Sequence, residues 1–238
     1  SLYWDKSTIA PIRDPRGNIQ SYVAIKEDVT QKRQVEEFLL DSENAVTHTL
    51  IGALDAMVGL LEARDPYTAG HSRNVSAIAL TIANEMKMPK AQIEGLRIAA
   101  MIHDVGKIQV PMDILNKPGR LTANEFELIK QHPQTAYDAI KEIPFPWDVP
   151  KIVLSHHEKW DGTGYPNGLK GEQIPLEAQI LSVADVLDAV CAHRPYRAQL
   201  GADKAFQIIE EGRGSSFSPT VVAAALRARE RIVKQLAG

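Results

Sequence analysis

Apolar residues recur at spacings of three and four along most of this 238-residue chain, which is the pattern of amphipathic helices. The longest run covers residues 31–64, and its stripe consists of Leu39, Val46, Leu50, Ala53, Met57 and Leu60. Short loops join the helices that we expect next, over residues 75–86, 93–101, 152–157, 176–192 and 219–236, with another starting at a capping box in residues 122–125. The pattern therefore predicts an all-α fold.

Two parts of the chain depart from this helical pattern. Residues 1–30 contain two short β-leaning runs around a dense turn signal, residues 13–18, and predict a β-hairpin. A lone hairpin is marginally stable in water, and the chain does not begin with Met, so we expect this remnant to end a domain that starts upstream. Residues 160–175 form a long loop rich in Gly and Pro, and a loop of this length is more often functional than idle.

The apolar stripe of residues 31–64 allows two arrangements. The helix packs on the helices of its own chain, or it pairs with its twin as a dimeric connector. Residues 1–30 are too few to cover the stripe, and an uncovered apolar stripe marks an interface, so we expect a parallel homodimer. Gly52 and Gly59 interrupt the seam, which keeps the first arrangement open.

Charge and cysteine content limit the class of protein. The chain carries 27 basic and 30 acidic residues, a balance that argues against a nucleic-acid polymer as partner. Its single cysteine excludes an internal disulfide and fits a reducing compartment. No apolar run approaches a membrane span, and no signal peptide is visible. We expect a cytoplasmic location, within a longer sensor protein.

Histidines and aspartates carry the chemistry that the sequence predicts. Five histidines and two aspartates fall at helix ends or on apolar helix faces: His71, His103, Asp104, His132, His156, His157 and Asp185. Imidazole and carboxylate together suit iron, manganese or zinc. Any one of these histidines alone would be interpreted as a hydrogen-bonded core residue, an interpretation we keep for His48 and His193. The carboxylates of Asp113, Asp148 and Asp188 are interpreted as helix caps.

Two adjacent pairs, His103-Asp104 and His156-His157, indicate how many metals the set would hold. Neighbouring residues on a helix point about 100° apart, so one ion is hard to chelate with both. Two ions suit them, with a carboxylate bridging both. Two metals roughly 3.5–4 Å apart are the usual device for hydrolysing phosphate esters. The pairs therefore favour a dinuclear phosphohydrolase.

An ordered series of motifs in this chain resembles those of a known family. The segments are 65–72 (DPYTAGHS), 103–108 (HDVGKI), 132–133 (HP), 156–166 (HHEKWDGTGYP), 185–189 (DVLDA) and 194–197 (RPYR). In this order they are similar to the HD-GYP branch of the HD phosphohydrolase superfamily, over roughly residues 50–230. The resemblance implies an HD-type helical bundle that hydrolyses cyclic di-GMP to the linear dinucleotide and/or GMP.

The resemblance also implies roles for individual residues. One metal would be held by His71, His103, Asp104 and Asp185, and the other by Asp104, His132, His156 and His157, with Asp104 bridging. Iron or manganese is expected, with zinc as the alternative. Tyr67 stands where some members have a Glu that helps hold a third metal, so we expect two ions. Substrate contacts would come from Lys107, Arg194, Arg197 and Tyr165.

Further alternatives concern partners and turnover. The loop at residues 164–166 would guide substrate or dock a partner such as a diguanylate cyclase domain. A receptor that binds cyclic di-GMP without cleaving it is the main alternative, and another substrate such as a nucleoside triphosphate is a third. The complete ligand set favours the enzyme, since a degenerate receptor should have lost ligands.

The N-terminal segment has a resemblance of its own. Residues 1–38 are similar to the C-terminal end of a PAS sensor domain. We therefore divide the chain into a sensor remnant (1–30), a connector helix (31–64) and an HD-GYP catalytic domain (65–238).

Overall fold

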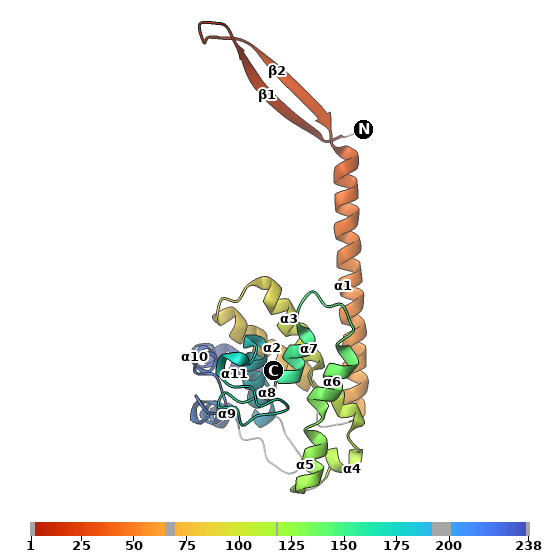
Figure 1. Cartoon of the computed structure of the whole chain (residues 1–238), viewed down its shortest axis with the longest axis vertical. Helices are drawn as coiled ribbons and strands as arrows, with labels where there is room; N and C mark the ends of the chain where they lie inside the picture. Colours follow the sequence, from red (N-terminus) through yellow and green to blue (C-terminus); the bar gives the residue numbers. More distant parts are fainter. Residues whose placement is uncertain (1–2, 65–69, 118, 192–200, 237–238) are drawn as a thin grey trace. The chain divides into compact units, whose positions relative to one another are not determined.

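The structure, a computed structural model, describes residues 3–64, 70–117, 119–191 and 201–236. It divides into two compact units, Ser1–Ala53 and Leu54–Gly238. The boundary falls inside one continuous helix, α1 (Thr30–Arg64). The described chain is mostly helical and has one two-stranded sheet, which confirms the predicted all-α class with a small hairpin and a long helix (Figure 1).

The first unit contains the predicted hairpin. Strands β1 (Asp5–Arg13) and β2 (Ile19–Asp28) pair antiparallel, with Asp5 opposite Asp28. The Asp14 carboxylate closes the turn because it accepts hydrogen bonds from the backbone N–H groups of Arg16 and Asn18, at 2.8 and 2.9 Å. A short Asp-Pro-Arg-Gly-Asn turn with its own side-chain acceptor is the signal that made this hairpin predictable.

Helix α1 differs from the sequence expectation in one respect. Over Thr30–Glu62 it is long enough and apolar enough to cross a membrane by length and composition alone. The expectation that no segment approaches such a span was therefore wrong on these two criteria. The same criteria are met by core helices of soluble proteins, and Val58 of this helix does lie in the hydrophobic core of the second unit.

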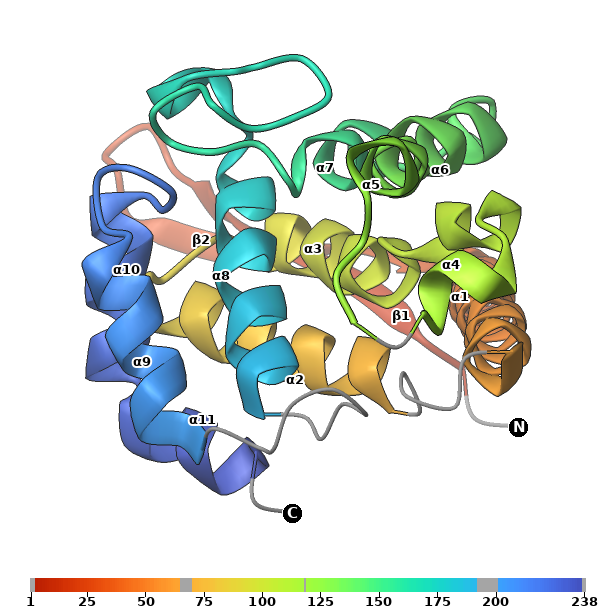
Figure 2. The same cartoon turned by 90° about the horizontal axis from the view of Figure 1, so that it is seen from below.

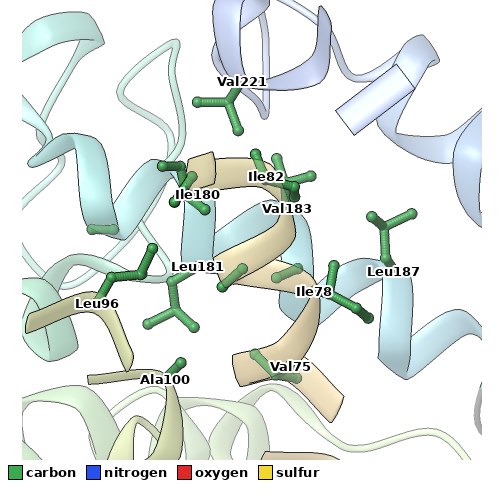
Figure 3. Packing of buried hydrophobic residues seen from close by; sticks show 14 of the residues in the cluster. Val75, Ile78, Ile82, Leu96, Ala100, Ile180, Leu181, Val183, Leu187 and Val221 are labelled. Carbon is green, nitrogen blue, oxygen red and sulfur yellow. The ribbon is translucent and has the colours of Figure 1, made fainter. Parts of the chain in front are cut away.

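Three helices build the centre of the second unit: α2 (His71–Glu85), α3 (Lys90–Ile102) and α8 (Leu176–Cys191). Figure 3 shows the apolar side chains that meet there, which are Val75, Ile78 and Ile82 of α2, Leu96 and Ala100 of α3, and Ile180, Leu181, Val183 and Leu187 of α8, with Val221 nearby. Burial of this apolar surface is the main stabilising contribution to such a fold. It also fixes the helix ends that carry the predicted ligands.

Shorter helices flank this centre on two sides (Figure 2). One side comprises η1 (Val105–Gln109), α4 (Met112–Leu115), α5 (Ala123–Ile129), α6 (His132–Ile140) and α7 (Val149–Ser155). The other comprises α9 (Gly201–Glu211), α10 (Pro219–Arg227) and α11 (Arg229–Leu236). The predicted capping box of Thr122 and Glu125 starts α5. The single last helix expected over residues 219–236 was wrong, because the chain breaks at Ala228 into α10 and α11.

Gly106 explains how η1 approaches α6. A Cβ atom at this position would overlap the backbone carbonyl oxygen of His132, so only glycine allows the two backbones to lie this close. The contact brings the residues just before η1 next to the first residue of α6. Both segments carry predicted metal ligands.

Candidate metal centre

All seven predicted metal ligands lie together in the second unit. His71 is the first residue of α2, His103 and Asp104 follow α3, His132 is the first residue of α6, and His156 and His157 follow α7. Asp185 alone comes from within a helix, α8. Helix ends are suited to such a site, because a side chain there can turn toward a neighbouring element without disturbing the helical backbone.

The ligand atoms form two groups. One contains His71, His103 and Asp185, and the other contains His132, His156 and His157. Within each group the candidate atoms all lie within 4.8 Å of one another. Each group thus offers three donors to one ion, and His103, His132 and His156 are fully buried.

Asp104 lies between the two groups. Its Oδ2 is 3.5 Å from Nε2 of His103 and 3.8 Å from Nε2 of His71. Its other oxygen, Oδ1, is 3.4 Å from Nε2 of His132. Because each carboxylate oxygen faces a different group, the geometry suits a bridging carboxylate.

The hydrogen bonds of three histidines show that the donor set fits a metal. The Nδ1 atoms of His103, His132 and His156 lie 2.8, 2.8 and 2.6 Å from the carbonyl oxygens of Ala100, Ile129 and Val153, each three residues earlier. Since a carbonyl only accepts, each Nδ1 carries the proton, and each Nε2 presents its lone pair to the site. This is how metal-binding histidines are normally oriented.

One atom of this set lacks a partner. Nε2 of His103 is buried and has no hydrogen-bond partner in the described parts of the chain. A buried polar atom without a partner is costly, and a cation at this position would remove the cost. The orphaned atom therefore supports a metal in the group that contains His71 and Asp185.

Three of the histidines, His132, His156 and His157, also have protonation states that suit a metal. Burial lowers the pKa of His132 to about 4, that of His157 to about 3, and that of His156 well below its usual range. Burial opposes ionisation of Asp104 too, but the positive charges of Lys107 and His71 hold the pKa of its carboxyl well below its usual range. At pH 7 these groups are neutral imidazoles and a carboxylate, the forms that bind metal.

Asp188 is a residue of the candidate site that the sequence analysis missed. It was interpreted as a helix cap, but it lies inside α8 and is buried, with its Oδ2 2.6 Å from Nδ1 of His71. Although burial lowers the pKa of His71, the contacts with Asp185 and Asp188 outweigh it and raise the pKa to about 10. The three-residue spacing from Asp185 was the signal that could have found Asp188, because it places both carboxylates on one helix face.

Lys107 lies beside the bridging carboxylate. Its Nζ is 2.6 Å from Oδ2 of Asp104, and both residues line a pocket that is partly open to solvent. The rest of the lining includes His71 and Glu62, together with apolar residues of α1, α3 and α4. The structure thus places an ammonium group at the wall of a cavity that reaches the candidate metal ligands.

Tyr165 closes another side of the site. Its ring stacks on His157, with centroids 4.9 Å apart, and Nζ of Lys130 lies 5.7 Å from its centroid. The loop that carries it folds back tightly, since a Cβ atom at Gly164 would overlap the backbone of Lys159. The buried carboxylate of Glu158 secures the loop by accepting hydrogen bonds from the N–H groups of Asn167 and Leu169, at 2.7 and 3.0 Å.

Some predicted residues are not part of this picture. Arg194 and Arg197, the predicted substrate contacts, lie outside the described residues, as do Tyr67 and His193. His48 is exposed on α1, so its interpretation as a core histidine was wrong.

The chain is similar to a known protein family and to several proteins with known names. The HD domain family model matches residues 55–221. A protein of Xanthomonas campestris pv. campestris named cyclic di-GMP phosphodiesterase response regulator RpfG is 37% identical over 215 residues, which cover 89% of this chain and 57% of that protein. A Vibrio cholerae protein named 3′3′-cGAMP-specific phosphodiesterase 3 is 39% identical over 170 residues, or 71% of this chain and 37% of that protein. The chain thus spans little more than half of the first relative.

A solved structure confirms the fold. The crystal structure of the cyclic GMP-AMP-specific phosphodiesterase V-cGAP3 of V. cholerae matches with a TM-score of 0.57 at 20% identity, over 78% of this chain and 51% of that one. The helical bundle expected from the resemblance is therefore the one observed.

Proposed function

Because this chain belongs to the HD domain family, we propose that it is a metal-dependent phosphodiesterase that hydrolyses cyclic di-GMP. One observation carries the proposal. The two groups of donors are complete, and the oxygens of Asp104 face one group each. The name of the 37% identical relative supports cyclic di-GMP as the substrate.

The proposed centre holds two divalent metal ions, iron or manganese, with zinc as the alternative. His71, His103 and Asp185 would hold one ion, His132, His156 and His157 the other, and Asp104 would bridge them. When bound, such ions act as Lewis acids toward phosphoryl oxygens and lower the pKa of water. The protein contributes the fixed orientation of the ligands, through the carbonyl oxygens of Ala100, Ile129 and Val153 and through Asp188.

The reaction proposed for this site is attack of water on phosphorus, in line with the 3′ oxygen that leaves. Lys107, whose Nζ donates to Oδ2 of Asp104 in this structure, would donate a hydrogen bond to a phosphoryl oxygen of the substrate. Tyr165 limits the space above His157 and meets the substrate there. Arg194 and Arg197 contribute further cationic contacts. The product is the linear dinucleotide and, after a second cut, GMP.

The two alternatives to this proposal are a receptor without turnover and a phosphodiesterase with a different cyclic dinucleotide as its substrate. A receptor without turnover would need none of the metal ligands, whereas all seven are present here. The 39% identical relative favours 3′3′-cGAMP as a second candidate substrate. It differs from cyclic di-GMP in one base only, so the same phosphodiester chemistry serves both.

The proposed setting is a cytoplasmic signalling protein with three parts. Residues 1–30 end a PAS-like sensor, residues 31–64 connect it, and residues 65–238 are catalytic. The connector pairs with its twin in a homodimer, and the loop at residues 164–166 docks a diguanylate cyclase domain. The exposed stripe supports the dimer: Leu39 and Val46 are 59% and 67% exposed, and in the second unit Leu60 is 73% exposed while Val58 faces the core.

The experiment that tests the substrate compares both dinucleotides. The purified chain is loaded with iron, manganese or zinc in turn and mixed with cyclic di-GMP or 3′3′-cGAMP, and the products are separated over time. We expect faster cleavage of cyclic di-GMP. Preferential cleavage of 3′3′-cGAMP would transfer the proposal to the second substrate, and cleavage of neither would contradict it.

A further inference from the structure

Helix α2 begins without a capping side chain of its own. Its N-cap residue is Gly70, which has a φ of 78° and no side chain that could accept a hydrogen bond. The first N–H groups of a helix have no partner within the helix, and Ser, Thr, Asp or Asn at the N-cap normally supplies one. The start of α2 therefore needs an acceptor from elsewhere.

Glu62 of α1 supplies this acceptor. Its Oε2 accepts a hydrogen bond from the backbone N–H of Gly70 at 2.9 Å, and its Oε1 accepts one from the N–H of Ser72 at 3.2 Å. A carboxylate at this end also interacts favourably with the helix dipole. The N-terminal cap of α2 is thus a side chain from a different helix.

The residue between these two N–H groups is His71, a candidate metal ligand. Its imidazole is held by Asp188 of α8, while the backbone on either side of it is held by Glu62 of α1. Glu62 and His71 also line the same cavity. The position of His71 therefore depends on two helices other than its own.

Another contact between the described parts of α1 and α2 involves side chains only. Asp55 pairs with Arg73 through exposed side chains, with Oδ2 3.2 Å from an arginine nitrogen. Val58 packs into the core. The pair of Asp55 and Arg73 links the same two helices, but among the described residues of α1 it is Glu62 that hydrogen-bonds to the turn carrying His71.

We propose that Glu62 is a positioning residue for His71, and that its hydrogen bonds couple the connector helix α1 to the metal centre. The inference rests on the metal centre of the proposed function but not on its substrate. Any displacement of the last turns of α1 relative to α2 must either carry the backbone around His71 with it or break both hydrogen bonds. A displacement of α1 would thereby change the position of His71, a candidate metal ligand.

The test uses Glu62→Ala and Glu62→Gln in the full chain, with Asp55→Ala as the matched control from the same helix pair. Metal affinity is measured by competition with a chelator, and amide hydrogen exchange is followed at Gly70 and Ser72. We expect Glu62→Ala to exchange both amides faster and to bind metal roughly tenfold more weakly, as is usual when support for a ligand is lost. Glu62→Gln keeps one acceptor oxygen and should fall between. Asp55→Ala should resemble the wild type.

Three results would overturn the inference: wild-type metal affinity in folded Glu62→Ala, an equal loss in Asp55→Ala, or weaker metal binding with unchanged amide exchange. The last result would make Glu62 a ligand rather than a positioning residue. If Glu62→Ala does not fold, Glu62→Gln decides by the same criteria. A chain that binds metal with this dependence but cleaves no cyclic dinucleotide would contradict the proposed function and leave this inference standing.

Discussion

Nδ1 of His71 lies 2.6 Å from Oδ2 of Asp188, and both side chains are buried. This contact fixes the proton on Nδ1 and leaves Nε2 facing Asp185, whose Oδ1 is 3.3 Å away. A carboxylate behind a metal-binding imidazole sets both its orientation and its basicity. Asp188 thus acts on the site through His71.

Replacing Asp188 with Ala should weaken metal binding at the group of His71, His103 and Asp185 by roughly 10- to 100-fold. Asp188→Asn should be milder, because its amide oxygen can still accept from Nδ1. Chelator competition on both variants measures the effect, with the exposed Asp138→Asn as control. Full metal affinity in folded Asp188→Ala would show that the contact does not support the ligand.

Replacing Asp104 with Ala should remove both metal ions from the purified chain, whereas His103→Ala should remove one. The difference follows from position, since Asp104 faces both groups and His103 belongs to one. Elemental analysis of the purified variants gives the number of ions per chain. Unchanged stoichiometry in Asp104→Ala would rule out the bridging role, and three ions in the wild type would contradict the expectation of two.

The metal-free chain should lose stability on acidification between pH 6.5 and about 4. His132, His156 and His157 have lowered pKa values when folded, so only the unfolded chain binds protons in this window, and stability falls with pH. Each such histidine lowers the free energy of unfolding by roughly 1.4 kcal/mol for each pH unit of acidification in this window. His71 acts oppositely: its stabilisation is complete below pH 6.5 and is lost as pH rises toward 10.

Thermal unfolding of the chelator-treated protein across this range measures the effect. His132→Gln should show a shallower decline, because it removes one of the groups concerned. A melting temperature that stays constant from pH 6.5 to 4 would contradict the burial of neutral imidazoles in the folded state.

Replacing Lys107 with Met should lower the rate of cleavage by roughly 100-fold, the usual cost of losing one donor to a developing charge. Metal content should remain, since Lys107 belongs to neither donor group. Initial rates and elemental analysis are compared with those of Lys141→Met, an exposed lysine paired with Asp138. A near-normal rate in Lys107→Met would remove this residue from the substrate site.

Replacing Leu50 with Glu should dissociate the proposed homodimer, because it places a charge in the apolar stripe of α1. Leu50 is 40% exposed in the single chain. Sedimentation of the wild type and of this variant gives the masses, with Thr49→Glu as a control from the adjacent position. A wild-type monomer, or a dimer indifferent to the substitution, would contradict the pairing of connectors.

The sequence predicts the features that local rules govern. The turn at Asp14, the capping box at Thr122 and the periodic stripes of α2, α3 and α8 are all of this kind. Helix α9 had the same signal, in the spacing of Ala205, Phe206 and Ile209, but was not predicted. The break at Ala228 has no clear signal, since apolar residues continue on both sides.

Partners in the tertiary structure were harder to predict. Asp188 and His71 are 117 residues apart, so their contact depends on how α2 and α8 pack, and the spacing from Asp185 shows only which helix face Asp188 shares. Glu62 looks like any polar residue near a helix end until the start of α2 is placed against it. The seven proposed ligands were identified from their placement on the expected helices and from the recognisable order of their motifs.

The most direct test of the central claim is cleavage of cyclic di-GMP by the metal-loaded chain, compared with Asp104→Ala under the same conditions. Products are separated at successive times, and nucleotide binding is measured in parallel. We expect the linear dinucleotide or GMP to accumulate with the wild type and not with the variant. A wild-type chain that holds its metals and binds cyclic di-GMP yet leaves it intact would contradict the claim and identify the protein as a receptor.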